Sequence, residues 1–183
     1  MFGVVFFFSK SPRDIPLPII KAKLIAVFAL TIALPILLFY LLKSLGQVKT
    51  IYLASVKERI VPLALNCLII LIITFRVTPY NEFSELYFFF VGILFSTLAC
   101  LIMAILKFKA SIHMIASAGI MMFFIGLSIH YSININGTLA LFAIIIGAIA
   151  TSRIHVRAHT NIELVIGFFT GLIPQLILLN YWL

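Results

Sequence analysis

The chain has 183 residues, of which 64% are hydrophobic and only 10% are charged, and its mean hydropathy is +1.26. This composition excludes an ordinary soluble domain, in which about half of the residues are apolar and about a quarter are charged. The net charge of +8 comes from 13 lysines and arginines scattered between apolar runs. Anionic membrane lipids are therefore the expected partners, and nucleic acid is not expected.

The apolar runs predict an all-α integral membrane protein built as a bundle of six transmembrane helices. Several runs approach the roughly 20 residues that a helix needs to cross a bilayer, and the two-residue alternation of a membrane β-strand is absent from the sequence. Residues 1–183 are expected to form a single membrane domain. The spans are expected near residues 24–42, 60–75, 86–106, 112–129, 138–150 and 162–183.

The first 23 residues carry three prolines and several charges, so residues 1–23 are expected to be an amphipathic or irregular lead-in. The fifth apolar run is short, and residues 17–20 are themselves apolar. Counts of five and seven spans therefore stay open.

Polar residues converge on one membrane face in this topology. We call the face that holds the N-terminal segment face B and the opposite face A. Each span switches sides, so the links after spans one, three and five all lie on face A, and three of the four histidines lie there. These links contain KERIVP at 57–62, KFKASIH at 107–113 and SRIHVRAHTNIE at 152–163. The arrangement predicts one polar site at the helix ends of face A.

Cations, serine hydroxyls and helix N-termini are the groups that bind phosphate. Histidines in the same place offer a nucleophile and an acid, because imidazole titrates near neutral pH. On a continuous helix the carboxylate of Glu163 lies beside His159, four residues earlier, and can fix its tautomer. With five acidic residues in the whole chain there is no carboxylate cluster, so neither a metal ion nor another cofactor is expected.

Structural interpretations stay open for the same residues. Thr160 and Glu163 also form a T-x-x-E capping box that would begin the sixth span. His113 can be a histidine that bonds a backbone carbonyl at a helix end, and Arg153 and Lys109 can be interfacial anchors. His130 lies on face B and is interpreted as a loop residue. The Gly167-x-x-x-Gly171 motif predicts close helix packing inside the bundle.

Residues 152–163 resemble the S-R-x5-H-x3-D signature of the type 2 phosphatidic acid phosphatase superfamily, with glutamate in place of the final aspartate. The middle motif of that family, P-S-G-H, is matched in part by Ala-Ser-Ile-His at 110–113. Its first motif, K-x6-R-P, keeps only Arg59, because the proline falls at Pro62 and Tyr52 stands where the lysine is expected. The chain most resembles short, divergent bacterial members in which K-x-S-x-H, here 109–113, replaces the middle motif.

The resemblance implies a lipid phosphatase that works through a phosphohistidine. His159 would be the nucleophile, Glu163 would orient it, and His113 would protonate the leaving alcohol. The residues expected to hold the phosphate are Arg59, Ser111, Ser152 and Arg153, with Lys57 or Lys109 in place of the missing lysine. Phosphatidic acid, phosphatidylglycerol phosphate, isoprenyl diphosphate and lipid A fit equally as substrates.

Lys10, Arg13, Lys21 and Lys23 precede the first span, which favours a cytoplasmic N-terminus and places face A outside the cytoplasm. The resemblance implies a multi-pass protein of the bacterial inner membrane, and a homo-oligomer stays open. Two other functions also stay open. One is a catalytically inactive family member that binds or moves anionic lipids, and the other is a transporter or structural membrane protein.

Overall fold

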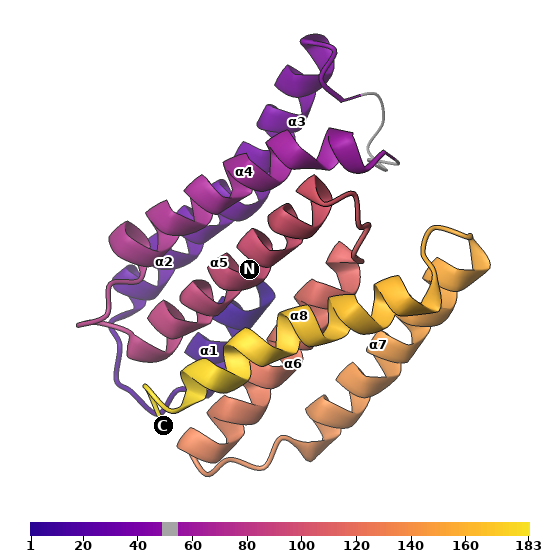
Figure 1. Cartoon of the computed structure of the whole chain (residues 1–183). Coiled ribbons are helices and arrows are strands. Elements are labelled where there is room, and N and C mark those ends of the chain that lie inside the picture. Colours follow the sequence, from indigo (N-terminus) through magenta and orange to yellow (C-terminus); the bar gives the residue numbers. More distant parts are fainter. Residues whose placement is uncertain (49–54) are drawn as a thin grey trace.

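The computed structural model describes residues 1–48 and 55–183, and in these ranges every regular element is a helix (Figure 1). Six helical segments are long and apolar enough to cross a membrane. They match the predicted spans in number and order, so the all-helical, six-span expectation is confirmed at this level. The six segments are Leu17–Ser44, Val56–Val77, Ser84–Ile105, Ile112–His130, Asn136–His155 and Asn161–Leu179.

The first two spans each contain a wide, π-helical turn. The first consists of α2 (Leu17–Phe28), η1 (Ala29–Ala33) and α3 (Leu34–Ser44), and the second of α4 (Val56–Ile72) and η2 (Ile73–Val77). Pro35 is the second residue after η1. Because proline lacks an N–H and its ring crowds the carbonyl four residues earlier, a wide turn at this place lets the helix continue past it.

The remaining spans are α5 (Ser84–Ile105), α6 (Ile112–His130), α7 (Asn136–His155) and α8 (Asn161–Leu179). The fifth span is longer than expected, since α7 continues through Ser152 and Arg153. It ends where Arg157 adopts a positive φ of 52° and Ala158 N–H donates to the carbonyl of Arg153, 3.0 Å away. This left-handed turn stops the helix without a glycine. Ser152 and Arg153 therefore lie in the last turn of a helix and not in a link.

The N-terminal segment differs from the expected lead-in. Residues Phe2–Lys10 form a helix, α1, whose Val4 and Phe7 side chains are fully buried. The ring of Phe6 stacks on Phe124 of α6 with centroids 4.0 Å apart. Since this run is apolar on every side, burial inside the bundle suits it better than an amphipathic position on the surface. At nine residues α1 is too short to cross a bilayer.

The helices pack in a sequence of neighbours rather than around one axis (Figure 1). The most extensive contacts join α6 with α8 and α4 with α5, and α8 also packs on α5. Helix α7 packs on α6, and α3 packs on α4. The segments Leu17–Ser44 and α7 lie at the periphery, so most of their apolar side chains face outward, as expected for lipid contact.

Two glycines let α8 approach α6 very closely, as the G-x-x-x-G motif predicted. A Cβ atom at Gly167 would lie 2.9 Å from the carbonyl oxygen of Ser111, and one at Gly171 would overlap the carbonyl oxygen of Ile115. Both obstacles are backbone atoms of α6 or its N-cap, which cannot move aside. The backbones therefore meet directly, and this contact places the first turn of α8 beside the first turn of α6.

A buried carboxylate joins four segments at the opposite end of the bundle. Glu85, in the first turn of α5, is fully buried and accepts from Arg13 Nη2 at 2.6 Å and from Tyr131 Oη at 2.7 Å. His130 Nε2 lies 3.4 Å from the same oxygen, so this residue is the last of α6 and part of a cluster, not a simple loop residue. Burial and the carboxylate raise the pKa of Tyr131 to about 12, which keeps the phenol a donor.

We expect Gly171→Ala to lower the free energy of unfolding by about 1–3 kcal/mol, because the added methyl overpacks the contact between α6 and α8. Gly147→Ala is the matched control. Gly147 lies on exposed α7 with nothing near its Cβ position, so this change should be neutral or slightly stabilising. Denaturant titration in detergent measures both. Equal effects of the two changes would contradict the close approach of the helices.

We expect Glu85→Gln to destabilise the protein by about 3 kcal/mol, because it breaks a buried ion pair and leaves the charge of Arg13 uncompensated. Glu82→Gln removes a carboxylate that also has a cation, with Lys23 Nζ 2.7 Å away, but its side chain is half exposed. This control should cost less than about 1 kcal/mol. Thermal unfolding of both variants in one detergent checks the difference, and similar losses would disprove the structural role of Glu85.

Candidate functional site

The pairing of His159 with Glu163 is the centre of the candidate site. His159 Nδ1 lies 3.0 Å from Glu163 Oε2, and the two side chains are 5% and 19% exposed. Because an ionised carboxylate only accepts, Nδ1 carries the proton of the neutral ring and Nε2 keeps its lone pair. The two side chains meet as expected, but not on a continuous helix: α8 begins only at Asn161, and the turn at its N-cap Thr160 brings His159 to the carboxylate.

Glu163 also belongs to the predicted capping box. Its Oε2 accepts from the backbone N–H of Thr160 at 3.0 Å, and Thr160 Oγ1 accepts from the backbone N–H of Glu163 at 3.3 Å. Glu163 can therefore cap α8 and contact the imidazole of His159 at the same time. The cap fixes the carboxylate, and the fixed carboxylate holds the imidazole.

Ser111 occupies the N-cap of α6 directly beside this pair. Its backbone N–H donates to the carbonyl of Glu163 at 3.3 Å, so the first turns of α6 and α8 are joined. The Ser111 hydroxyl is fully buried and has no hydrogen-bond partner among residues 1–48 and 55–183, and it does not cap its own helix. A buried hydroxyl without a partner at the N-terminus of a 19-residue helix is suited to a bound anion.

Two cations join the face-A links. Arg59 of α4 is 6% exposed, and its Nη1 donates to the carbonyl of Ala110 at 3.1 Å. Lys109 Nζ donates to the carbonyl of Ala158 at 3.1 Å, just before His159. The link between α5 and α6 is therefore bound to α4 through Arg59. The same link is bound to the link between α7 and α8 through Lys109. Both cations end at the site that the sequence predicted for them.

His113 and Arg153 complete the group. The imidazole of His113, in the first turn of α6, lies within electrostatic range of Arg153, His159 and Arg59. Arg153 Nε is buried and has no hydrogen-bond partner among the described residues. This guanidinium nitrogen near His113 is a second position that an anion would satisfy.

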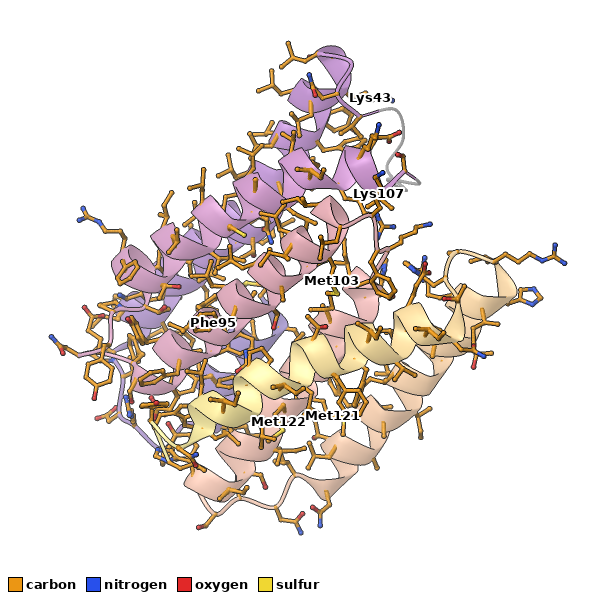
Figure 2. All side chains as sticks on the ribbon, viewed as in Figure 1. Lys43, Phe95, Met103, Lys107, Met121 and Met122 are labelled. Atoms are coloured by element: carbon orange, nitrogen blue, oxygen red, sulfur yellow. The ribbon has the colours of Figure 1, made fainter. Side chains whose placement is uncertain are left out.

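Lys57 and Ser152 are not brought into this group. Both are exposed, and within residues 1–48 and 55–183 neither makes a hydrogen bond or ion pair with the other candidate residues. Tyr52, which stands where the resemblance expects lysine, lies outside the described residues. Lys109 is therefore the lysine that the structure places next to His159. Figure 2 shows another lysine, Lys107, at this end of the bundle, where it occupies the left-handed turn that ends α5.

Sequence reasoning missed Glu85, the second buried carboxylate. The rule that singled out Glu163, that a carboxylate inside an apolar run needs a partner, applies equally to Glu85. The nearby His130-Tyr131 pair on the same face was the available signal. In the described part of the chain no three His, Cys, Asp or Glu side chains lie close enough to hold a metal ion.

Burial lowers the pKa of His159 below its usual value of 6.5, the hydrogen bond with Glu163 raises it, and the charges of Arg59 and Lys109 lower it again. The net direction is downward. The ring is therefore neutral at neutral pH, and its protonation destabilises the folded state as the pH falls below 6.5.

We expect the imidazole of His159 to titrate below pH 6.5 in NMR spectra of the protein in micelles, with His159→Gln identifying its resonance. Glu163→Gln should lower this pKa further because a stabilising negative charge is lost. Lys109→Gln should raise it because a repelling positive charge is lost. Shifts of the same sign in the two variants would contradict the arrangement of charges around the ring.

Comparison with known proteins gives no match: no family model, no curated protein and no solved structure is similar to the chain. The likeness to the type 2 phosphatidic acid phosphatases therefore consists of the motif residues and their order. These residues lie at or beside the ends of four different helices, and the contacts described above bring Arg59, Ser111, His113, Arg153, His159 and Glu163 to one end of the bundle.

Proposed function

We propose that this protein is a membrane lipid phosphatase that hydrolyses a phosphate ester or diphosphate of a lipid through a phosphohistidine, without a metal ion. The observation that carries the proposal is the His159–Glu163 pair, held 3.0 Å apart at the same end of the bundle as two buried polar groups, the Ser111 hydroxyl and Arg153 Nε, which have no hydrogen-bond partner in the described part of the chain. Phosphoryl transfer requires this combination of a positioned nucleophile and fixed positive charge.

In this proposal the phosphate oxygens are bound by Arg59, Arg153 and Lys109, by the Ser111 hydroxyl, and by the free N–H groups at the start of α6. Guanidinium groups form charge-assisted hydrogen bonds with phosphate, and the helix terminus adds partial positive charge. Because these groups are fixed by their backbone contacts, they stabilise the charge of the transition state with little reorganisation.

The reaction proceeds in two steps. His159 Nε2 attacks phosphorus, so that a P–N bond forms while the P–O bond to the lipid alcohol breaks, and protonated His113 gives its proton to the leaving oxygen. Glu163 stabilises the positive charge that develops on the His159 ring. Neutral His113 then takes a proton from water, whose oxygen attacks phosphorus and breaks the P–N bond. Inorganic phosphate leaves, and both histidines return to their initial state.

The position of the site suits a lipid substrate. All of its residues lie at the ends of apolar helices, so a tail can stay among lipids while its phosphate reaches the cations. We place the protein in the bacterial inner membrane, with the N-terminus in the cytoplasm and the site outside it. Lys10 and Arg13 before the first span, with Lys21 and Lys23 in its second turn, support this orientation.

The first test measures phosphate release by the purified protein from a panel of lipid phosphates and diphosphates with EDTA present. We expect release by the wild type and none by His159→Ala, because the variant lacks the nucleophile. His155→Ala is the matched control, since His155 is exposed at the end of α7 and outside the site. Release that survives in His159→Ala, or that EDTA abolishes, would disprove the mechanism.

The two roles of Glu163 can be separated by a pair of variants. Glu163→Gln keeps an oxygen that can accept from Thr160, so stability should be retained, while turnover should fall on the order of 10²–10⁴-fold as the charge is lost. Thr160→Ala removes the cap and should cost about 1 kcal/mol of stability, with a much smaller effect on turnover. The opposite pattern would mean that Glu163 serves only as a cap.

The capping box also favours a second function, since it gives Glu163 a structural reason to be present without catalysis. In that case the protein is an inactive relative that binds or moves anionic lipids. Binding of a lipid phosphate that depends on Arg153, with no phosphate release from any substrate, would establish this second function.

A further inference from the structure

We infer that the groove between α7 and α8 binds one acyl chain of a glycerophospholipid phosphate while the phosphate occupies the polar site. The inference rests on the proposed function, because it names the lipid whose phosphate that site receives. Helices α7 and α8 both pack on α6 but hardly touch each other, although a short link joins them (Figure 1). A groove of about 320 Å³ is left between them.

The groove is apolar along its whole length. Met114 of α6 contributes to its lining from between the two outer helices, Ala150 and Ile154 come from α7, and Leu164 and Phe168 come from α8. Its exposed lining carries no polar surface. A hydrocarbon chain is therefore the ligand class that this surface suits, and a polar ligand would lose hydrogen bonds with water on entering it.

The groove is continuous with the polar site through the chain itself. Its lining residues Met114, Ile154 and Leu164 directly follow His113, Arg153 and Glu163 in the sequence. The groove thus begins within one residue of the site on each of the three helices. On α7, which runs opposite to α6 and α8, it continues inward to Ala150, so a chain attached to a phosphate at the site can enter the groove there.

The depth of the groove matches one leaflet of a bilayer. Along α8 it extends from Asn161 to Phe169, which is about 12 Å at a rise of about 1.5 Å per residue. Half of a bilayer core is about 15 Å thick. The groove therefore covers most of the length of an acyl chain that ends within its own leaflet. A long polyprenyl chain would extend well past it.

The test uses a tryptophan placed in the groove as a reporter. Phe168→Trp is made in a His159→Ala background, so that no lipid is consumed, and Ile154→Trp gives a second reporter on the opposite wall. The fluorescence of the single native tryptophan, Trp182, near His130 at the other end of the bundle, is subtracted. Vesicles contain either phosphatidic acid or phosphatidylcholine with bromine on the acyl chains, because bromine quenches tryptophan on contact.

We expect brominated phosphatidic acid to quench the reporter several-fold more than brominated phosphatidylcholine at the same mole fraction. This difference should vanish when Arg153→Ala is added, since the phosphate is then no longer held above the groove. Phe95→Trp is the matched control, because Phe95 lies on the outer surface of α5 near the middle of its span. Both lipids should quench that reporter equally.

Two results would overturn the inference. Equal quenching of the groove reporters by both lipids would mean that any bilayer lipid enters the groove. Quenching by neither lipid would mean that protein covers it, such as a second copy of this chain. The readout is independent of turnover. Phosphate release by the wild type without selective quenching of the reporters would disprove acyl-chain binding in the groove but not the phosphatase activity. Selective quenching without phosphate release would support acyl-chain binding and disprove the phosphatase activity.

Discussion

The direct backbone contact between α6 and α8 is the constraint on which the rest of the structure depends. Gly167 and Gly171 bring α8 against the carbonyl oxygens of Ser111 and Ile115. This contact sets the position of the two helices along their axes, so that Glu163 in the first turn of α8 meets Ser111, the N-cap of α6. A side chain as small as a methyl at either glycine would separate the helices and the two halves of the site.

The cations at face A have a structural as well as a chemical role. Arg59 and Lys109 each donate to a backbone carbonyl of a neighbouring link, and so they fix three links that are distant in sequence. Positive charge gathered in a partly buried place repels itself, and the carbonyl contacts offset part of that cost. An anion would offset more of it. Arg59 and Lys109 therefore hold the links together and at the same time leave an excess of positive charge that a bound anion would neutralise.

The sequence predicted the six spans, because apolar length is a local property. The sequence also predicted that His159 meets Glu163, but on one continuous helix, whereas the contact forms across the N-cap of α8. It did not predict that α7 would carry Ser152 and Arg153 in its last turn, since a left-handed arginine, not a glycine, ends that helix. Nor did it predict the burial of α1 or the partners of Glu85. The burial of α1 and the partners of Glu85 depend on which helices, distant in sequence, pack against each other. Hydropathy does not indicate which helices will be neighbours.

The burial of α1 has a consequence for the order of assembly in the membrane. This helix precedes all six spans, yet its aromatic partner Phe124 lies on α6, and the arginine that follows it, Arg13, pairs with Glu85 of α5. Until α5 and α6 have been inserted, α1 has no binding surface inside the bundle, and its apolar side chains stay at the membrane interface. A segment that is made before the spans is thus among the last to reach its final position, and its docking completes the packing at the end of the bundle opposite the site.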